Sequence, residues 1–245
     1  MDSEFPQLVL PWCESLRRGL GPERIDNSVV NVDGGSYSRN PDAQVYKDRP
    51  TLRVANNATL NVTNADVTGT YCDVFVTGAT ANLFGGTYTN TNEYSDCKSP
   101  ALKVWNGGTL SVNGATVECM GDNAAISSGE PAGSYYHYKY GDGGKLVVEN
   151  CTIKNSKYGI YLGPDSSTSA ELKSATFENN ESDIYLESDK EITISDTFTT
   201  QATIKVATRK KAVSSRSQAM QTSCTLRART RTTTWRMTRH SAIIT

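Results

Sequence analysis

Apolar residues recur at every second position in short runs along the chain, and one pattern of this kind occurs six times. Each copy has two apolar residues two positions apart, then two intervening residues, a small residue and a further apolar position. The copies are Val30-x-Val32-x-x-Gly35-x-Tyr37, Leu60-x-Val62-x-x-Ala65-x-Val67, Ala81-x-Leu83-x-x-Gly86-x-Tyr88, Leu110-x-Val112-x-x-Ala115-x-Val117, Leu146-x-Val148-x-x-Cys151-x-Ile153 and Ala170-x-Leu172-x-x-Ala175-x-Phe177. Because side chains two positions apart lie on one face of a strand, each copy predicts two short strands.

A corner separates the two strands of each copy. The residues at this point are Gly34, Asn64, Gly85, Gly114, Asn150 and Ser174. Five of these six are Gly or Asn, the residues that adopt a positive φ at the lowest cost. The pattern therefore predicts a strand, a left-handed corner and a second strand.

A second apolar pair lies between successive copies and predicts a third strand in each unit. It is seen as Val74-x-Val76, Leu102-x-Val104, Ile160-x-Leu162 and Ile184-x-Leu186, with weaker versions at Ala43-x-Val45 and Ala124-x-Ile126. The central apolar residues fall at 32, 62, 83, 112, 148 and 172. This uneven spacing favours coils of strands with variable loops over helical repeats, whose period is nearly constant. A β-sandwich is the alternative, but it does not require the same corner in every unit.

The chain is therefore predicted to be all-β, a right-handed parallel β-helix of about six to seven coils that share one core. Residues 28–206 form this helix, and Ile192-x-Ile194 with Phe198 is its last, degenerate coil. Residues 1–27 are either a cap, with a short amphipathic helix at 11–21, or a non-native leader. Residues 207–245 are a tail, expected to be disordered or the product of a frame shift.

The repeated unit, with its Asn or Gly corner, resembles the parallel β-helix of the pectate-lyase-like superfamily. It is most similar to the non-enzymatic repeat regions of bacterial surface and secreted proteins. The resemblance implies an extracellular or cell-surface protein, although the chain has no signal peptide at its start. Such folds also include lyases, glycosidases and carbohydrate esterases.

Charge divides the chain at the end of the repeats. Nine of the 25 basic residues and none of the 26 acidic residues lie in 207–245, so residues 1–206 have a net charge of −10. A basic tail is typical of nucleic-acid binding, but its mixture of Arg, Thr, Trp, Met and Cys makes nucleic acid the least favoured partner. No apolar run is long enough for a membrane span, and no cofactor or metal motif occurs. Cys151 is expected to be a buried thiol.

In the resembled enzymes, a carbohydrate cleft follows the first strand of each coil. The outward positions predicted there are Phe75, Lys103, Ala125, Tyr161 and Tyr185, none of which is acidic. Candidate catalytic carboxylates instead come from the adjoining loops: Glu93, Asp96, Glu118 and Asp122. Stacked coils can bring two carboxylates within the range of a glycosidase pair; alternatively, these acids are solvated surface residues.

The longest insertion, 127–144, concentrates Tyr135, Tyr136, Tyr138 and Tyr140 around His137. These tyrosines, with Trp105, are candidates for stacking against a sugar or a protein partner. Alternatively, they pack back onto the coil. A catalytic triad is not supported, because His137 is the only histidine before the tail.

Two hypotheses follow. The first is a non-catalytic β-helical module that binds a polysaccharide or a surface protein. The alternative is a carbohydrate-active enzyme, a glycoside hydrolase, polysaccharide lyase or carbohydrate esterase, that uses the loop carboxylates. A separate prediction concerns four outward polar residues, which are expected to form a structural ladder of side-chain hydrogen bonds between coils. They are Asn31, Asn61, Asn82 and Ser111.

Overall fold

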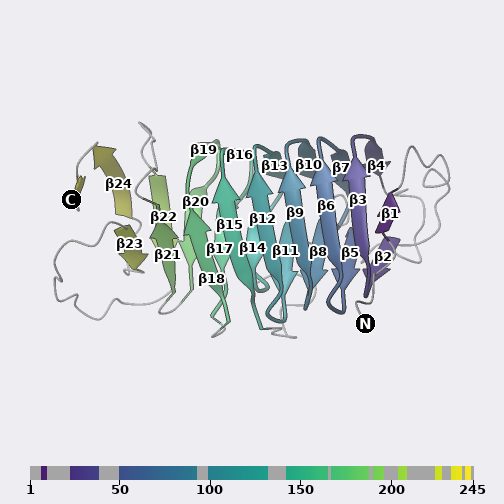
Figure 1. Cartoon of the computed structure of the whole chain (residues 1–245). Helices are drawn as coiled ribbons and strands as arrows, with labels where there is room; N and C mark the ends of the chain where they lie inside the picture. Colours follow the sequence, from purple (N-terminus) through teal and green to yellow (C-terminus); the bar gives the residue numbers. More distant parts are fainter. Residues whose placement is uncertain are drawn as a thin grey trace.

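The computed structural model of the chain describes residues 7–9, 23–38, 50–92, 99–131, 142–164, 167–187, 190–195, 204–208, 224–227, 233–238 and 241–243. Every regular element in these ranges is a strand. The strands form three sheets along a solenoid of about six turns, and Figure 1 shows the coils stacked along one axis. The predicted all-β parallel solenoid is confirmed.

Each coil contributes one strand to each sheet, apart from the ends of the rod. The nine-stranded sheet contains β1 (Gln7–Val9), β3 (Val29–Asp33), β6 (Thr59–Thr63), β9 (Thr80–Phe84), β12 (Thr109–Asn113), β15 (Lys145–Glu149), β18 (Ser169–Leu172), β21 (Glu191–Ile194) and β23 (Cys224–Arg227). The six-stranded sheet contains β4 (Ser36–Ser38), β7 (Asp66–Gly69), β10 (Thr87–Asn90), β13 (Thr116–Cys119), β16 (Cys151–Lys154) and β19 (Ala175–Glu178). The ten-stranded sheet contains β2 (Glu23–Asp26), β5 (Pro50–Ala55), β8 (Cys72–Thr77), β11 (Leu102–Trp105), β14 (Ala124–Ser128), β17 (Tyr158–Leu162), β20 (Ser182–Leu186), β22 (Ile204–Thr208), β24 (Thr233–Thr238) and β25 (Ser241–Ile243).

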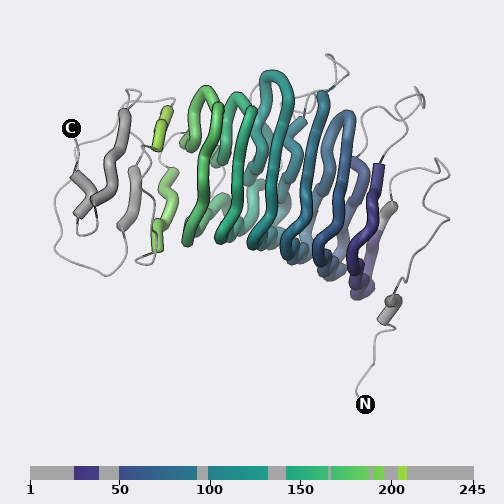
Figure 2. The backbone as a smooth tube through the Cα atoms, turned by 90° about the horizontal axis from the view of Figure 1, so that it is seen from above, coloured from purple at the N-terminus to yellow at the C-terminus, as the bar shows by residue number. Residues whose placement is uncertain are grey.

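Equivalent residues of successive coils pair in register. Leu110 of β12 pairs with Ala81 of β9 and with Leu146 of β15, and Val112 pairs with Leu83 and Val148. All of these side chains are buried. One coil cannot enclose its own inner face, so the coils, which Figure 2 shows next to one another along the rod, share one core.

The predicted corners are confirmed at five of the six positions. Gly34, Asn64, Gly85, Gly114 and Asn150 have φ values of 66°, 52°, 66°, 71° and 52°. Ser174 is not among the residues of positive φ. The corner therefore follows the residues that tolerate it, rather than the position alone.

The predicted ladder is confirmed for its asparagines. The Asn61 side chain donates a hydrogen bond of 2.8 Å to Oδ1 of Asn31, and Asn82 donates one of 2.9 Å to Oδ1 of Asn61. These bonds run along the axis of the rod on the outer face of the nine-stranded sheet.

One of the two weaker strand predictions was wrong in register, and the other is not tested. In β5 the inward pair is Leu52 and Val54, which lie in register with Val74 and Val76, whereas the predicted pair at 43–45 lies outside the described residues. In β14 the residue that pairs with Leu102 is Ile126, not Ala124. Alternation alone did not show that Ser128 continues the inner row, because a serine carries no apolar signal.

The ends of the rod also contain strands. β1 pairs with β3, and β2 with β5, both in parallel. At the other end β23, β24 and β25 pair antiparallel to their neighbours. The predicted helix at 11–21 lies outside the described residues, and the domain boundaries at 27/28 and 206/207 stay predictions.

Candidate functional site

The outer face of the ten-stranded sheet differs from the outer faces of the other two sheets. In the nine-stranded sheet, β6 and β9 alternate buried inward with less buried outward residues. In the ten-stranded sheet, β8, β11 and β14 are buried almost continuously. Strands with this pattern have both faces removed from solvent.

One row of outward residues crosses this sheet in register. It runs Arg53, Phe75, Lys103, Ser127, Tyr161 and Tyr185. Ser127 replaces the predicted Ala125, which belongs to the core, because of the register of β14. Lys103 and Tyr161 point outward but are only 1% and 2% exposed.

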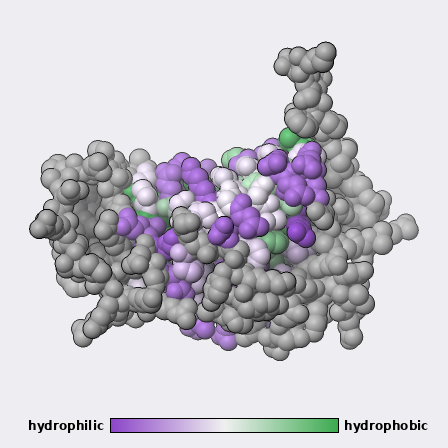
Figure 3. Space-filling model, turned by 90° about the horizontal axis from the view of Figure 1, so that it is seen from below, coloured by the Kyte–Doolittle hydropathy of each residue, from purple (hydrophilic) through white to green (hydrophobic). Residues whose placement is uncertain are grey.

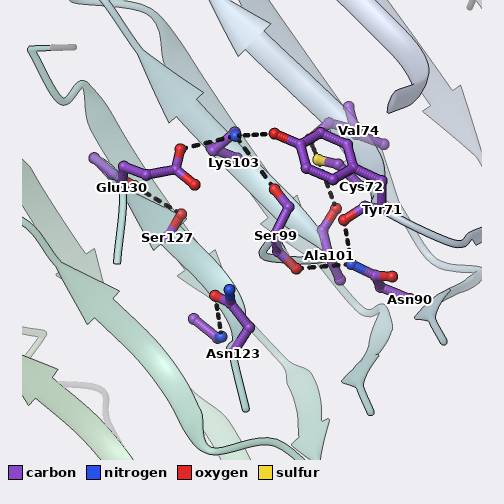
Figure 4. A network of polar contacts seen from close by, with 12 residues as sticks. Tyr71, Cys72, Val74, Asn90, Ser99, Ala101, Lys103, Asn123, Ser127 and Glu130 are labelled. Carbon is purple, nitrogen blue, oxygen red and sulfur yellow. Dashed lines mark hydrogen bonds and ion pairs between the residues drawn. The ribbon is translucent and has the colours of Figure 1, made fainter. Parts of the chain in front are cut away.

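Lys103 is held by a buried polar network (Figure 4). Its Nζ donates hydrogen bonds to Glu130 Oε2 at 2.8 Å, Ser99 Oγ at 3.2 Å and the Tyr71 hydroxyl at 3.4 Å. An ammonium group has three N–H donors, so all of them are used. Lys103 therefore lies in a complete set of acceptors supplied by the turns around β8, β11 and β14.

Aromatic rings enclose the same ammonium group. Lys103 Nζ lies 4.7 Å from the ring centres of Phe75 and Trp105, and 5.3 Å from that of Tyr71. Phe75 and Trp105 meet edge to face, with centroids 5.1 Å apart. Rings at these distances stabilise a cation through their quadrupoles.

These surroundings keep Lys103 charged. Burial lowers the pKa of Lys103, but the carboxylate of Glu130, with smaller contributions from Tyr71 and Cys72, more than offsets this, and the pKa is raised overall. A lysine in this state is not available as a general base for Ser99, although the two side chains are hydrogen-bonded.

A second polar layer supports the network. The buried Asn90 amide donates hydrogen bonds to the carbonyl oxygens of Tyr71 and Ser99 and so fixes two residues that contact Lys103. Burial raises the pKa of Cys72, and that of the Tyr71 hydroxyl, to about 12. Both groups therefore remain protonated, and Cys72 is not a reactive thiolate.

Tyrosines dominate the same face further along the rod. Tyr161 and Tyr185 stack with centroids 5.5 Å apart and an interplanar angle of 8°, and Tyr158 lies 4.6 Å from Tyr185. The Tyr161 hydroxyl donates a hydrogen bond of 2.9 Å to Oε1 of the buried Glu187. Tyr158 and Tyr185 are half-buried, so parts of both rings face solvent.

Asp73 is a buried carboxyl group within β8 of this sheet. Neither of its two carboxyl oxygens has a hydrogen-bond partner among the described residues. The backbone of Gly69 lies close to Oδ1 of Asp73. Burial raises the pKa of Asp73 well above its ordinary value, and the Gly69 backbone opposes this only in part.

The structure places two of the four predicted catalytic carboxylates. Glu118 lies on the six-stranded sheet, where it accepts a hydrogen bond of 2.8 Å from Asn155 and pairs with Lys154 Nζ at 3.8 Å. Asp122 is exposed in the turn before β14. Glu93 and Asp96 lie outside the described residues, so whether the four carboxylates meet in one cleft stays a prediction.

Of the predicted ligand-binding residues, the structure describes Trp105. It is half-buried, and its indole N–H is buried without a hydrogen-bond partner in the described part of the chain. Tyr135, Tyr136, Tyr138 and Tyr140 lie outside the described residues. The confirmed buried thiol is Cys151, which is 2% exposed.

Sequence reasoning missed the acidic residues of this face. Glu130 and Glu187 come from the turns that follow β14 and β20, so they are absent from a list of outward strand positions. The available signal was Lys103 itself, a lone cation between Leu102 and Val104 and in register with Phe75.

No group of His, Cys, Asp and Glu side chains within the described ranges is arranged to hold a metal ion. The described segments also include no helix with the length and apolar character of a membrane span.

Searches with protein-family models, curated proteins and solved structures find no match to the chain. The fold defines the class of protein, a parallel β-solenoid.

Proposed function

We propose that the protein is a non-catalytic β-solenoid module that binds a polysaccharide along the outer face of its ten-stranded sheet. The observation that carries this proposal is the set of partly exposed rings on that face. Phe75, Trp105, Tyr158 and Tyr185 are all half-buried, so each is held by packing on one side.

Rings fixed in this way suit a carbohydrate ligand. A rigid ring offers a large apolar surface at little entropic cost, and a tyrosine hydroxyl adds a polar contact. Successive coils are about 4.8 Å apart, so Phe75 with Trp105, and Tyr158 with Tyr185, form two pairs of rings on adjacent coils. Each pair offers a stacking surface to a sugar unit, and a polymer that runs along the rod can contact both pairs.

Few large apolar side chains of the described residues are exposed outside this face. Figure 3 shows the coloured residues seen from below as mainly hydrophilic or neutral, with separate hydrophobic spots. The exposed large apolar side chains in the described ranges are Phe84 and Met120. Phe84 lies on the nine-stranded sheet and provides a matched control.

Binding is favoured over catalysis because three of the described buried carboxylates near this face are already engaged, and a fourth, Asp73, is 0% exposed and therefore out of reach of a substrate. Glu130 pairs with Lys103, Glu187 accepts from Tyr161, and Asp183 accepts from the Lys205 backbone at 2.7 Å. General acid–base catalysis requires carboxyl groups that can exchange protons with the substrate.

The test is retention on a panel of insoluble polysaccharides, with reducing ends measured in the same samples. We expect retention by the wild type and by F84A, loss of retention in the Y158A/Y185A variant, and no product. Circular dichroism and thermal melting establish that each variant is folded.

The same assay addresses the alternative, a carbohydrate-active enzyme. Product release that is abolished by D96N or D122N would replace the binding module with a hydrolase or lyase. No retention by any polysaccharide, together with capture of a protein through the same tyrosines, would identify a surface protein as the partner.

A further inference from the structure

The charge pair of Lys103 and Glu130 is removed from solvent on both sides. The Nζ–Oε2 distance is 2.8 Å, and the two side chains are 1% and 0% exposed. The other ion pairs of the described residues are more accessible; in that of Lys173 and Glu149 the side chains are 36% and 37% exposed, and the atoms are 3.5 Å apart.

The buried pair is only partly satisfied. Lys103 uses all three donors, but Oε1 of Glu130 is buried and has no hydrogen-bond partner among the described residues. Desolvating two charges is costly unless every polar atom is paired. A reaction that removes both charges would remove this cost.

We propose that Lys103 and Glu130 condense to form an intramolecular isopeptide bond. A bond forms between Nζ of Lys103 and Cδ of Glu130, and one Cδ–O bond of the carboxyl group breaks. The ammonium group brings three hydrogens; one remains on the amide nitrogen, and two leave with the carboxyl oxygen as water. No oxidant, reductant or cofactor is consumed.

The hydrogen bonds of the network provide the proton transfers. The ion pair is the resting state, and movement of one proton along the 2.8 Å hydrogen bond gives a neutral amine beside a neutral carboxylic acid. A desolvated neutral lysine is a competent nucleophile. The hydroxyls of Ser99 and Tyr71, at 3.2 and 3.4 Å from Nζ, position the amine, and its protons pass to the departing carboxyl oxygen along the contact between Nζ and Oε2.

Proximity and dryness favour the forward reaction. Two reacting groups fixed in contact correspond to an effective concentration of about 10⁵–10⁸ M. The rings of Phe75 and Trp105 over Nζ exclude water, the reagent of the reverse reaction. The exposed Lys173–Glu149 pair has neither advantage and should not react.

The bond would tie β11 to the turn after β14, across 27 positions of the sequence. Glu130 immediately precedes Pro131, after which the sequence continues into the tyrosine-rich insertion. The cross-link would therefore anchor the base of that insertion to the sheet, whatever ligand the face binds.

Mass spectrometry of the denatured full-length protein tests the proposal. Uncross-linked protein gives tryptic peptides 99–103 and 104–139, because trypsin cleaves after Lys103. The cross-linked protein should give one peptide spanning 99–139 that is lighter than its sequence mass by one water, since an acylated lysine is not cleaved. The intact chain should show the same deficit.

K103R removes the nucleophile and should restore full mass and cleavage after position 103, whereas K173R should retain the deficit. Wild-type peptides of full sequence mass would overturn the proposal, and so would a deficit that persists in K103R. The measurement on the wild type does not depend on whether any variant folds.

Discussion

Substitution of Val112 by aspartate is expected to destroy the rod, because this residue lies in the middle of the shared core. Val112 is 1% exposed, and it pairs with Leu83 on one side and Val148 on the other. A carboxylate at this position would meet apolar side chains from three coils, with no cation or hydrogen-bond donor from the inner rows of the nine-stranded sheet.

The size of the effect follows from a graded series at this position. V112A deletes two methyl groups, which costs about 1.6 kcal/mol of transfer free energy, and the residual cavity raises the loss to about 2–3 kcal/mol. V112D adds an unpaired buried charge, which costs several kcal/mol more. The total approaches the whole stability of an ordinary domain, about 5–15 kcal/mol.

The matched control is S111D, which places the same charge on the same strand but on its half-buried outer face. We expect S111D to change the free energy of unfolding by about 0.5 kcal/mol or less. Denaturant titration followed by circular dichroism measures all three variants. Hydrogen exchange should show the first loss of protection in β9, β12 and β15, because each coil contacts mainly its neighbours. A V112D protein as stable as S111D would refute the shared core.

Three further substitutions test other parts of the structure. Because burial raises the pKa of Asp73, the folded protein keeps this proton to a higher pH than the unfolded chain; the unfolding free energy of the wild type should fall as pH rises above 3.8. D73N should flatten this profile and be the more stable protein near neutral pH in denaturant titrations, whereas identical pH profiles would contradict the assignment. N61A removes two ladder hydrogen bonds and should cost about 1–3 kcal/mol; a loss near zero would show that the ladder does not stabilise the coils. G86A should prevent folding or lower the melting temperature strongly, because Gly86 has φ +80° and its added Cβ would overlap the backbone of Ala65; an unchanged melting curve would refute this close approach of two coils.

The sequence predicted the inner face of the coil well because that face depends on local information. An apolar pair and a corner residue within one copy are enough to specify two strands and the turn between them. Gly114 and Asn150 show this, since both adopt the expected positive φ. The register of β14 was missed because Ser128 occupies an inward position without an apolar side chain.

The outer face was predicted less well because the burial of its side chains depends on which turns pack against which strands. The alternation of apolar and polar residues correctly predicts that the Lys103 side chain points outward. In an isolated strand, an outward side chain would be exposed to solvent. Its burial comes from Glu130, Ser99 and Tyr71, which lie 27, four and 32 positions away in the sequence. These contacts depend on loops of variable length, so the repeat pattern of the sequence does not predict them.

The contrast between the faces locates the specialised part of the molecule. On the nine-stranded sheet the outer row begins with the asparagine ladder, which joins three coils, and continues with Ser111, Val147 and Glu171. On the ten-stranded sheet the outer row contains a buried cation and a stack of tyrosines, and carboxylates from the adjoining turns bind both. Hydrogen bonds between neutral side chains are enough to join neighbouring coils, as Asn31, Asn61 and Asn82 show. A buried ion pair adds a cost of desolvation that joining coils does not require, so the outer face of the ten-stranded sheet is the specialised part of the rod.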